Sequence, residues 1–211
     1  MERGRFITFE GIEGVGKSTN MQAFASAVEA AGHTILCTRE PGGTPQAERI
    51  RQIVSAHSDE PMSDIAELLL IFAARSLHVD NVIRPAIESG TWVLCDRFTD
   101  SSRAYQGAGR GIAMQQVDEL ANWVHSDLWP DLTILLDAPV EVGMSRANQR
   151  GEPDRFEIEK SEFFARVRTC YLDLAAREPQ RFQVVDASRS LAEVTAHVER
   201  IAARFLSDSL L

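Results

Sequence analysis

Eight residues near the start of the chain, 11–18, have the types and the spacing that bind a chain of phosphates. They read Gly-Ile-Glu-Gly-Val-Gly-Lys-Ser and fit G-x-x-x-x-G-K-[ST], the P-loop. Such a loop aims backbone N–H groups and a helix N-terminus at an anion, and its glycines let the backbone approach the phosphates closely. Lys17 supplies a point charge for the β- and γ-phosphates, and Ser18 offers a hydroxyl to Mg²⁺. The residues expected to bind ATP are Gly11, Ile12, Glu13, Gly14, Val15, Gly16, Lys17, Ser18 and Thr19.

The sequence on either side of this loop supports the same interpretation. Residues 5–10 are rich in β-branched and aromatic types and predict a strand, whereas residues 19–31 predict a helix that ends at Gly32. A chance glycine turn before a helix is the alternative. It is the weaker one, because motif, strand and helix agree.

An acidic residue and an arginine follow another apolar strand, residues 92–95. Asp96 stands where a carboxylate would organise Mg²⁺ and its waters beside a P-loop, so Ser18 and Asp96 are the expected metal ligands. Arg97 can form a bidentate contact with a phosphate. A surface ion pair at the end of a strand is the alternative for these two residues.

Apolar runs and helical patterns alternate along the whole chain, which we expect to form one domain, residues 1–211. The predicted strands are residues 5–10, 34–38, 92–95, 132–136 and 182–185. The predicted helices are residues 19–31, 44–56, 63–89, 113–126, 140–149, 157–176 and 191–206, and Pro85 is expected to kink the third. Five short apolar strands separated by helices imply an α/β fold with a five-stranded parallel sheet flanked by helices on both faces. Ligands of such folds bind beyond the carboxyl ends of the strands.

Composition excludes several classes of function. A formal net charge of −9 argues against a polymeric nucleic-acid partner, which needs a basic face. No signal peptide and no run long enough to span a membrane are present, so no membrane partner is expected. The three cysteines, Cys37, Cys95 and Cys170, are widely spaced in apolar contexts, which predicts buried free thiols in a reducing cytoplasm.

Two further segments are similar to a known family. Residues 38–44 read T-R-E-P-G-G-T, and residues 96–111 read D-R-F-T-D-S-S-R-A-Y-Q-G-A-G-R-G. With the P-loop, they resemble the thymidylate kinases, which show T-R-E-P-G-G-T after the second strand and D-R-x-x-x-S-x-x-A-Y-Q-G-x-G-R-G after the third. The resemblance covers nearly the whole chain. It implies a P-loop kinase fold and transfer of the γ-phosphate of ATP to dTMP, with Mg²⁺, giving dTDP for dTTP synthesis.

A segment with three arginines, residues 146–157, joins two predicted helices. In nucleoside monophosphate kinases such a segment is a lid that closes over the phosphates. The resemblance implies a bacterial subtype with its catalytic arginine in the lid and an acidic residue, here Glu13, in the P-loop. Arg150 is the first candidate to neutralise the transferring group, followed by Arg146 and Arg155. A solvated charged loop is the alternative.

The resemblance also implies a thymine-binding helix around residues 67–75, in which a ring stacks on the base and Arg75 bonds its O4. In much of the family the ring lies four residues before the arginine, where this chain has Ile71. Phe72, three before Arg75, shares that helix face, and we expect it to stack on the base. A core phenylalanine is the alternative.

The remaining acceptor residues follow from the same resemblance. Arg97, assisted by Arg39, is expected to hold the acceptor phosphate. Glu13 would contact the sugar 3′-OH, and Tyr105 would crowd the 2′ position and favour deoxyribose. Ser102 and Gln106 would lie near thymine, and adenine near residues 186–189.

The acceptor is itself a phosphate with a second pKa near ~6, so the reaction needs no general base. Positioning and charge neutralisation by Lys17, Arg97 and the lid arginines would carry it. One alternative is a P-loop kinase acting on another (deoxy)nucleoside monophosphate. Another is a regulatory nucleotide switch, although the chain has no Asn-Lys pair for the N-K-x-D guanine reader. A homodimer, typical of the family, could form through residues 63–89 and 113–126.

Overall fold

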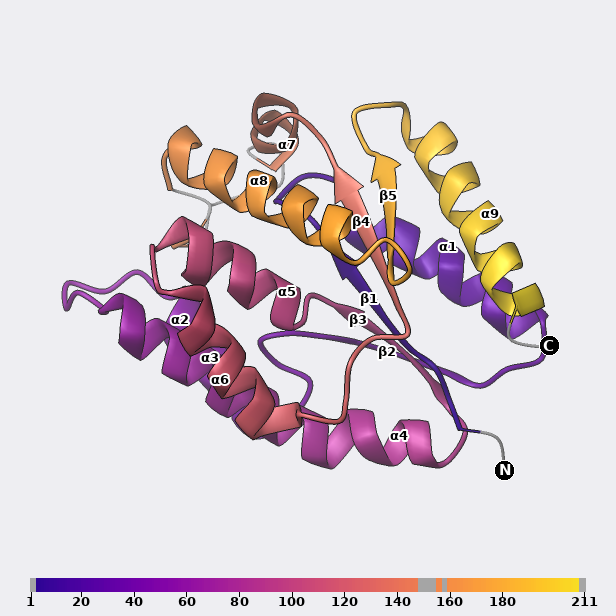
Figure 1. Ribbon diagram of the computed structural model, residues 1–211, viewed down its shortest axis with the longest axis horizontal. Helices are drawn as coiled ribbons and strands as arrows, with labels where there is room; N and C mark the ends of the chain where they lie inside the picture. Colours follow the sequence, from indigo (N-terminus) through magenta and orange to yellow (C-terminus); the bar gives the residue numbers. More distant parts are fainter. Residues whose placement is uncertain (1–2, 148–154, 157–158, 209–211) are drawn as a thin grey trace.

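The computed structural model describes residues 3–147, 155–156 and 159–208 (Figure 1). Within these residues, the strands form one parallel sheet in the order β2-β3-β1-β4-β5, with helices on both faces. The strands are β1 (Phe6–Glu10), β2 (Ile35–Arg39), β3 (Trp92–Asp96), β4 (Leu132–Asp137) and β5 (Phe182–Asp186). The predicted α/β architecture with a five-stranded parallel sheet is thereby confirmed.

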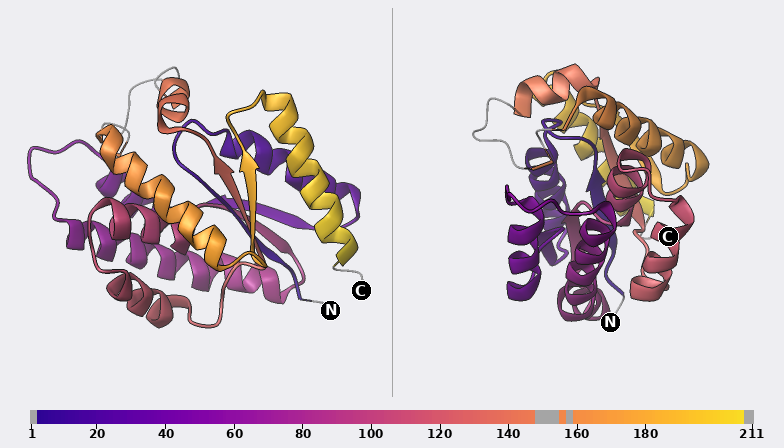
Figure 2. Two further views of the ribbon diagram at one scale, coloured as in Figure 1. Left: turned by 45° about the horizontal axis from the view of Figure 1, so that its top comes forward. Right: turned by 90° about the vertical axis from the view of Figure 1, so that its left-hand side faces the viewer.

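Helical segments make every connection between the strands, as right-handed crossovers of a parallel sheet require. The helices are α1 (Lys17–Ala30), α2 (Pro45–Ser55), α3 (Asp64–His78), α4 (Arg84–Glu88), α5 (Thr99–Ser102), α6 (Met114–His125), α7 (Val140–Ala147), α8 (Ser161–Arg177) and α9 (Leu191–Asp208). Two π-helical segments, η1 (Val79–Ile83) and η2 (Arg103–Gly109), interrupt the regular helices. The turned views in Figure 2 show α1 and α9 side by side on one face of the sheet.

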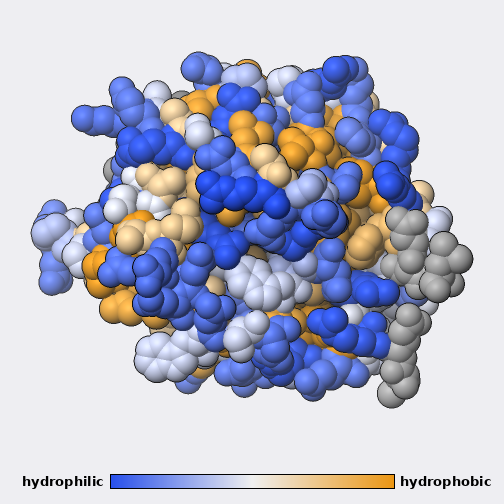
Figure 3. Space-filling model, in the orientation of Figure 1, coloured by the Kyte–Doolittle hydropathy of each residue, from blue (hydrophilic) through white to orange (hydrophobic). Residues whose placement is uncertain are grey.

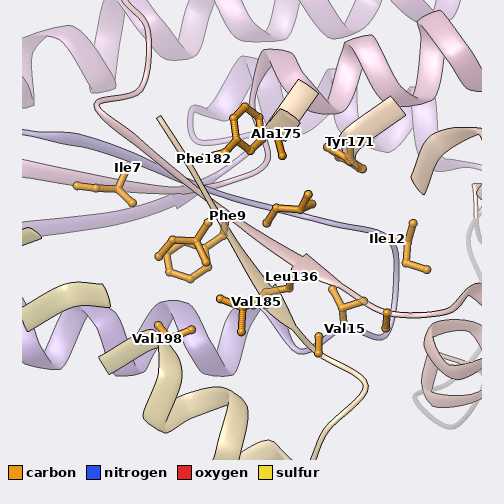
Figure 4. Close-up of a cluster of buried hydrophobic side chains, with 14 of the residues drawn as sticks. Ile7, Phe9, Ile12, Val15, Leu136, Tyr171, Ala175, Phe182, Val185 and Val198 are labelled. Atoms are coloured by element: carbon orange, nitrogen blue, oxygen red, sulfur yellow. The ribbon is translucent and has the colours of Figure 1, made fainter. Parts of the chain in front are cut away.

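The side chains of the middle strand, β1, alternate between the two faces of the sheet. Phe9 points to the face covered by α1, where its ring contacts Phe24 edge to face at 5.9 Å. Figure 4 shows Phe9 with Val198 of α9 on one side of the strands and Tyr171 of α8 on the other. Glu10, the next residue of β1, therefore points toward α8, and the Tyr171 hydroxyl donates to its carboxylate.

The carboxyl ends of β1 and β3 lie side by side. Phe9 is the register partner of Asp96, and the N–H of Arg97 donates to the Phe9 carbonyl at 3.0 Å. The chain leaves β1 for β2 on one side of the sheet and leaves β3 for β4 on the other, so this is the switch point at which ligands bind in open α/β sheets. The P-loop and the Asp96–Arg97 pair consequently share one edge.

Two predicted helices, and one stretch for which no helix was predicted, differ from the observed elements. The helix expected over residues 63–89 is divided into α3, η1 and α4, with the π-helical turn just before Pro85. Proline has no N–H to continue the regular hydrogen-bond ladder, and a wide turn accommodates this. The helix expected from residue 157 begins at Ser161. Residues 99–109, for which the sequence predicted neither a helix nor a strand, form α5 and η2.

The polarity of the surface and the burial of two of the three cysteines agree with what the composition predicts. Figure 3 shows a face dominated by hydrophilic residues, with the apolar ones in separate patches. None of the described helices is both long enough and apolar enough to cross a membrane. Cys95 and Cys170 are buried, but the prediction that Cys37 is buried was wrong, because it lies exposed on the edge strand β2.

Candidate active site

A cavity of about 280 Å³ opens at the carboxyl ends of β1 and β3. The P-loop, the turn after β2, and α2, α3 and η2 form its walls. Most of the predicted site residues line it: Glu13, Gly14, Gly16, Lys17, Ser18, Arg75, Asp96, Arg97, Ser102, Tyr105 and Gln106.

The P-loop has the geometry of an anion site. Gly16 caps α1 with a left-handed backbone (φ 85°), and no side chain caps the helix, so its first N–H groups can face a phosphate. Gly14 has φ 74°, and a Cβ there would lie 1.9 Å from the carbonyl oxygen of Gly143 in α7. Only glycine fits at that position.

Lys17 places its charge inside this loop. Its Nζ donates to the carbonyl oxygens of Gly11 at 3.2 Å and Ile12 at 3.0 Å. Burial, and then the neighbouring charge of Arg97, lower the pKa of Lys17 below its ordinary value. A cation so poorly hydrated gains much from an anionic phosphate.

Arg97 and Glu13 form an ion pair across the cavity. The Nη2 of Arg97 donates to Glu13 Oε1 at 2.8 Å, and its Nη1 donates to the Gly11 carbonyl at 2.9 Å. The Tyr105 hydroxyl donates to both oxygens of Glu13, at 2.8 and 2.9 Å. Arg97 has φ 72°, a left-handed conformation that is uncommon outside glycine. The loop acid, the arginine and the tyrosine are thus held as one unit.

The region beside Ser18 and Asp96 suits a magnesium ion bound together with phosphates. Among the described residues, Asp96 Oδ1 is a buried side-chain oxygen without a hydrogen-bond partner. The Ser18 residue is exposed at the same cavity. The described residues contain no group of three His, Cys, Asp or Glu side chains that could hold a metal unaided. A hydrated Mg²⁺ that takes one or two protein oxygens plus phosphate oxygens fits this donor set.

Arg75 is buried at the other end of the cavity. Its Nε donates to Glu40 Oε2 at 2.7 Å, its Nη1 to Ser102 Oγ at 3.0 Å and its Nη2 to the Phe98 carbonyl at 3.1 Å. Burial would raise the pKa of Glu40, but Arg75 and then His78 hold it below its ordinary value. The guanidinium is therefore fixed in orientation, as recognition of a flat base requires.

The expectation for Phe72 differs from its observed place. Phe72 packs in a satellite cluster with Val117 and Ala121 of α6, and its ring lies 4.5 Å from the Arg75 guanidinium carbon. Ile71 lines the cavity instead. Helix α6, which covers this face of α3, is the reason that the ring is in the core.

Arg39 also lies elsewhere than expected. It is 56% exposed and pairs with Glu48 of α2 at 3.0 Å, outside the cavity lining. Arg51 of α2 lines the cavity, with its Nη1 donating to the Pro41 carbonyl at 3.1 Å. The helical spacing of Arg51, Val54 and Ser55 marks a common face, but only the placement of α2 shows that this face borders the cavity.

The lid arginines are dispersed. Arg146 donates to the carbonyls of Ala187 at 2.7 Å and Ser188 at 3.2 Å, and it lines a second cavity of about 290 Å³ beside the P-loop. Arg155 donates to the Val54 carbonyl at 2.8 Å and to Glu67, outside the first cavity. Arg150 falls outside the described residues. The described geometry thus places neither Arg146 nor Arg155 at the expected site of phosphoryl transfer.

Sequence reasoning missed the buried acids that surround the cavity. Glu67 accepts from Gln106 at 2.8 Å and from Arg110 at 3.2 Å, besides Arg155. His78, which the sequence left without a role, donates to or accepts from Glu40 at 3.0 Å. The sequence holds a weak signal for both acids. Glu67 interrupts an apolar helical stretch, and Glu40 lies within the T-R-E-P-G-G-T motif.

Comparison with known proteins agrees with this geometry. A model of the thymidylate kinase family matches residues 9–198. The thymidylate kinase of Pseudomonas syringae pv. tomato is 53% identical over 203 residues, covering 96% of this chain and 97% of the relative. That of Alcanivorax borkumensis is 54% identical over 198 residues, covering 94% and 95%. The crystal structure of thymidylate kinase from Ehrlichia chaffeensis superposes with a TM-score of 0.75 at 31% identity, covering 97% of this chain and 99% of that one. Sequence and fold agree over nearly the full length, and the chain belongs to the thymidylate kinase family.

Proposed function

We propose a role for each residue of the cavity in the reaction that this chain catalyses, the ATP-dependent phosphorylation of dTMP to dTDP. One observation carries the assignment: the P-loop lysine Lys17, the strand-end Arg97 and the buried Arg75 line the same cavity. Such a cavity can hold a second phosphate compound against the phosphates of ATP.

The acceptor needs orientation more than activation. Its phosphate is largely dianionic at neutral pH, because its second pKa lies near ~6, so no proton has to be removed. Holding donor and acceptor in line, and neutralising charge on the transferring group, then supply the rate enhancement. The Arg97 guanidinium and the Lys17 ammonium are the cations placed to do so.

Arg97 and Arg51 together bind the acceptor phosphate in this proposal. Both line the cavity, and both guanidinium groups are anchored to backbone carbonyls, of Gly11 and Pro41 respectively. A planar guanidinium suits two oxygens of one phosphate. Arg51 replaces Arg39 as the assisting residue.

The nucleoside lies between the ion pair and α3. Glu13 contacts the 3′-OH, and the Tyr105 ring, fixed by its bond to Glu13, excludes a 2′-hydroxyl. Arg75 donates to O4 of thymine, with Ser102 and Gln106 beside the base, and Ile71 rather than Phe72 is the apolar contact.

Mg²⁺ bound with ATP would take Asp96 and Ser18 as its protein partners, and it would supply charge neutralisation for the phosphates. The unpartnered Asp96 Oδ1 supports this assignment. Adenine lies in the second cavity, against Arg146 and the turn that contains Arg189.

Among the lid arginines, Arg150 is the remaining candidate for the transition-state charge. Arg146 bonds the Ala187 carbonyl beside the second cavity, and Arg155 bonds the carbonyl of Val54 at the border of the first, without lining it. An arginine supplied within the chain can contribute about 10³–10⁵ in rate.

A substrate panel tests the acceptor assignment. Purified enzyme is assayed with ATP, Mg²⁺ and dTMP, dUMP or dCMP, and kcat/KM is compared. Loss of one methyl group costs about 10–200-fold, whereas facing two donors against each other costs about 10⁴–10⁵. The expected order is dTMP, then dUMP, with dCMP negligible; equal use of dCMP would overturn the base-site assignment.

We also propose that the enzyme is a homodimer that works in the cytoplasm. Ile65 and Leu69, one turn apart on α3, are 49% and 51% exposed, and Trp123 on the neighbouring α6 is 85% exposed. The described cysteines are free thiols, as is typical of a reducing compartment. Light scattering on wild type and Leu69→Glu tests the dimer: the variant should become monomeric, and a monomeric wild type would contradict the proposal.

A further inference from the structure

Glu10 is a buried carboxylate with no contact to the cavity. It ends β1, is 0% exposed and is absent from the cavity lining. Its Oε1 accepts from the N–H of Phe98 at 2.8 Å, and its Oε2 accepts from Ser101 Oγ at 2.6 Å and from the Tyr171 hydroxyl at 2.8 Å. These partners come from two segments that are distant in sequence from β1, the start of α5 and the middle of α8.

Each partner of Glu10 also constrains Arg97. Phe98 directly follows Arg97 in the chain. The hydrogen bond from the Phe98 N–H to Glu10 therefore fixes the C-terminal side of the left-handed Arg97 backbone (φ 72°). The oxygens of Ser101 and Tyr171 accept from Arg97 Nη1 at 3.3 and 3.4 Å. A non-glycine residue persists in such a conformation only where its surroundings determine it fully.

The direction of these hydrogen bonds gives the carboxylate a defined task. A hydroxyl has one proton, and while Ser101 and Tyr171 donate it to Glu10, their lone pairs are free to accept from Arg97. If Glu10 became a donor there, at least one hydroxyl would have to accept from it. The two hydroxyls lie 2.8 Å apart, so that hydroxyl can give its proton to the other one. The proton of the second hydroxyl then has no acceptor within this group, because the guanidinium is itself only a donor.

We propose that Glu10 is a positioning residue for Arg97: through the Phe98 amide and the Ser101 and Tyr171 hydroxyls, its carboxylate holds the guanidinium where the acceptor phosphate binds. This inference rests on the proposed role of Arg97. It assigns a function in acceptor binding to a strand residue that does not itself line the cavity.

The environment of Glu10 shows that packing alone does not explain an acid at this position. Burial, and then the charge of Asp100, raise the pKa of Glu10 to about 7. A buried charge is costly, and an apolar residue of similar volume would often stabilise a core better. The charged and titratable groups that face Glu10 are Asp100 of α5, Arg97 after β3, Tyr171 of α8, Lys17 of α1 and Cys95 of β3.

Glu10→Gln is the main test, because it keeps the shape and the acceptor for Phe98 but puts a donor toward Ser101 and Tyr171. We expect KM for dTMP to rise about tenfold, the effect of one or two misdirected hydrogen bonds, with KM for ATP within about twofold. The ratio of wild-type to variant kcat/KM for dTMP should be near one at pH 6 and should rise toward pH 8. Titration of dTMP itself cancels in this ratio.

Thr8→Val is the matched control. Thr8 lies two residues earlier on β1, on the same sheet face, and its hydroxyl makes a buried hydrogen bond with Thr133 at 2.9 Å. Losing that bond should lower stability but leave KM for dTMP unchanged. Tyr171→Phe removes one hydroxyl that links Glu10 to Arg97, and it should raise KM for dTMP by itself but add little to Glu10→Gln.

Arg97→Lys, measured in parallel, separates the two proposals. If Arg97→Lys leaves KM for dTMP unchanged, the acceptor-phosphate role of Arg97 fails. If Arg97→Lys raises KM while Glu10→Gln and Tyr171→Phe do not, the positioning role of Glu10 is overturned. If Glu10→Gln does not fold, Tyr171→Phe and Ser101→Ala decide the question by the same measurement.

Discussion

The Nε of Arg75 lies 2.7 Å from Glu40 Oε2, and both side chains are almost completely buried. This ion pair joins the base end of the cavity to the turn after β2, and His78 completes it from the next turn of α3. An interior charge pair of this kind orients the guanidinium, and breaking it leaves a buried charge without its partner.

Arg75→Ala should therefore have two separable effects. It should lower the free energy of unfolding by about 3–5 kcal/mol, because Glu40 loses its counter-ion. It should also shrink the preference for dTMP over dCMP by several powers of ten, because the donor that faces O4 is gone. The preference is measured as a ratio of two kcat/KM values on one preparation, so the fraction of folded enzyme cancels.

Arg84→Ala is the control for this prediction. Arg84 pairs with Asp127 at 2.7 Å on the surface, where an ion pair contributes only about 0–1 kcal/mol. Its substitution should alter neither the selectivity nor, to any large degree, the stability. An unchanged dTMP preference in Arg75→Ala would remove Arg75 from the base site.

The two lysines of the chain, Lys17 and Lys160, allow a direct test of the P-loop. Lys17→Ala should reduce kcat by orders of magnitude and leave the fold intact, because the hydrogen bonds of its Nζ, to the carbonyl oxygens of Gly11 and Ile12, stay within the phosphate-binding loop. Lys160→Ala, at the exposed N-terminal end of α8, should leave turnover unchanged. Equal turnover of Lys17→Ala and wild type would refute the ATP-binding assignment.

Arg150 and Arg155 should differ in kinetic phenotype. Arg150→Ala should lower kcat more than it raises KM for dTMP, as loss of a contact made mainly in the transition state does. Arg155→Ala should act chiefly through KM, because its guanidinium bonds Val54 and Glu67 beside the acceptor cavity rather than the reacting groups. Steady-state kinetics on both variants settle the matter, and the reverse pattern would exchange their roles.

The sequence predicted those parts of the fold and site that depend on neighbours in the chain. The P-loop is a local strand, turn and helix, and Asp96–Arg97 follows a strand whose carboxyl end must lie at the same edge of a parallel sheet. That this strand is the direct neighbour of β1 is seen only in the structure. Phe72 and Ile71, in contrast, are adjacent on one helix. The packing of α6 against Phe72 buries that ring, and Ile71 lines the cavity instead. No pattern of neighbouring residues in the sequence indicates this tertiary contact.

Glu10 shows the same limit more clearly. In the sequence it is the last residue of a strand, and nothing near it indicates a partner. Tyr171, which lies 161 positions later, and Ser101, 91 positions later, give the carboxylate its role. Long-range hydrogen bonds of this kind emerge only when the sheet and α8 are assembled. Arg51 was missed for the corresponding reason, since its role depends on how α2 lies across the sheet edge.

The raised pKa of Glu10 predicts a pH-dependent stability that Glu10→Gln should abolish. In the unfolded chain the carboxyl titrates near its ordinary value of 4.5, whereas burial raises the pKa in the folded protein to about 7. Between these values the folded state binds the additional proton, so the stabilising contribution is complete below pH 4.5 and is lost as the pH rises to 7. The loss should be on the order of 3 kcal/mol.

Thermal or urea unfolding of wild type and Glu10→Gln from pH 4.5 to 8 measures this contribution. His125 acts in the opposite sense, because burial and then Arg75 lower its pKa to about 4, so its contribution grows as the pH rises toward its ordinary value of 6.5. The His125 contribution is common to both proteins and cancels in their difference. Wild type should therefore lose stability relative to Glu10→Gln as the pH rises, although it binds dTMP better there. If the stability difference between wild type and Glu10→Gln did not change with pH, Glu10 would be ionised throughout this range. The pH dependence of the kcat/KM ratio for dTMP, which its positioning role predicts, would then also be absent.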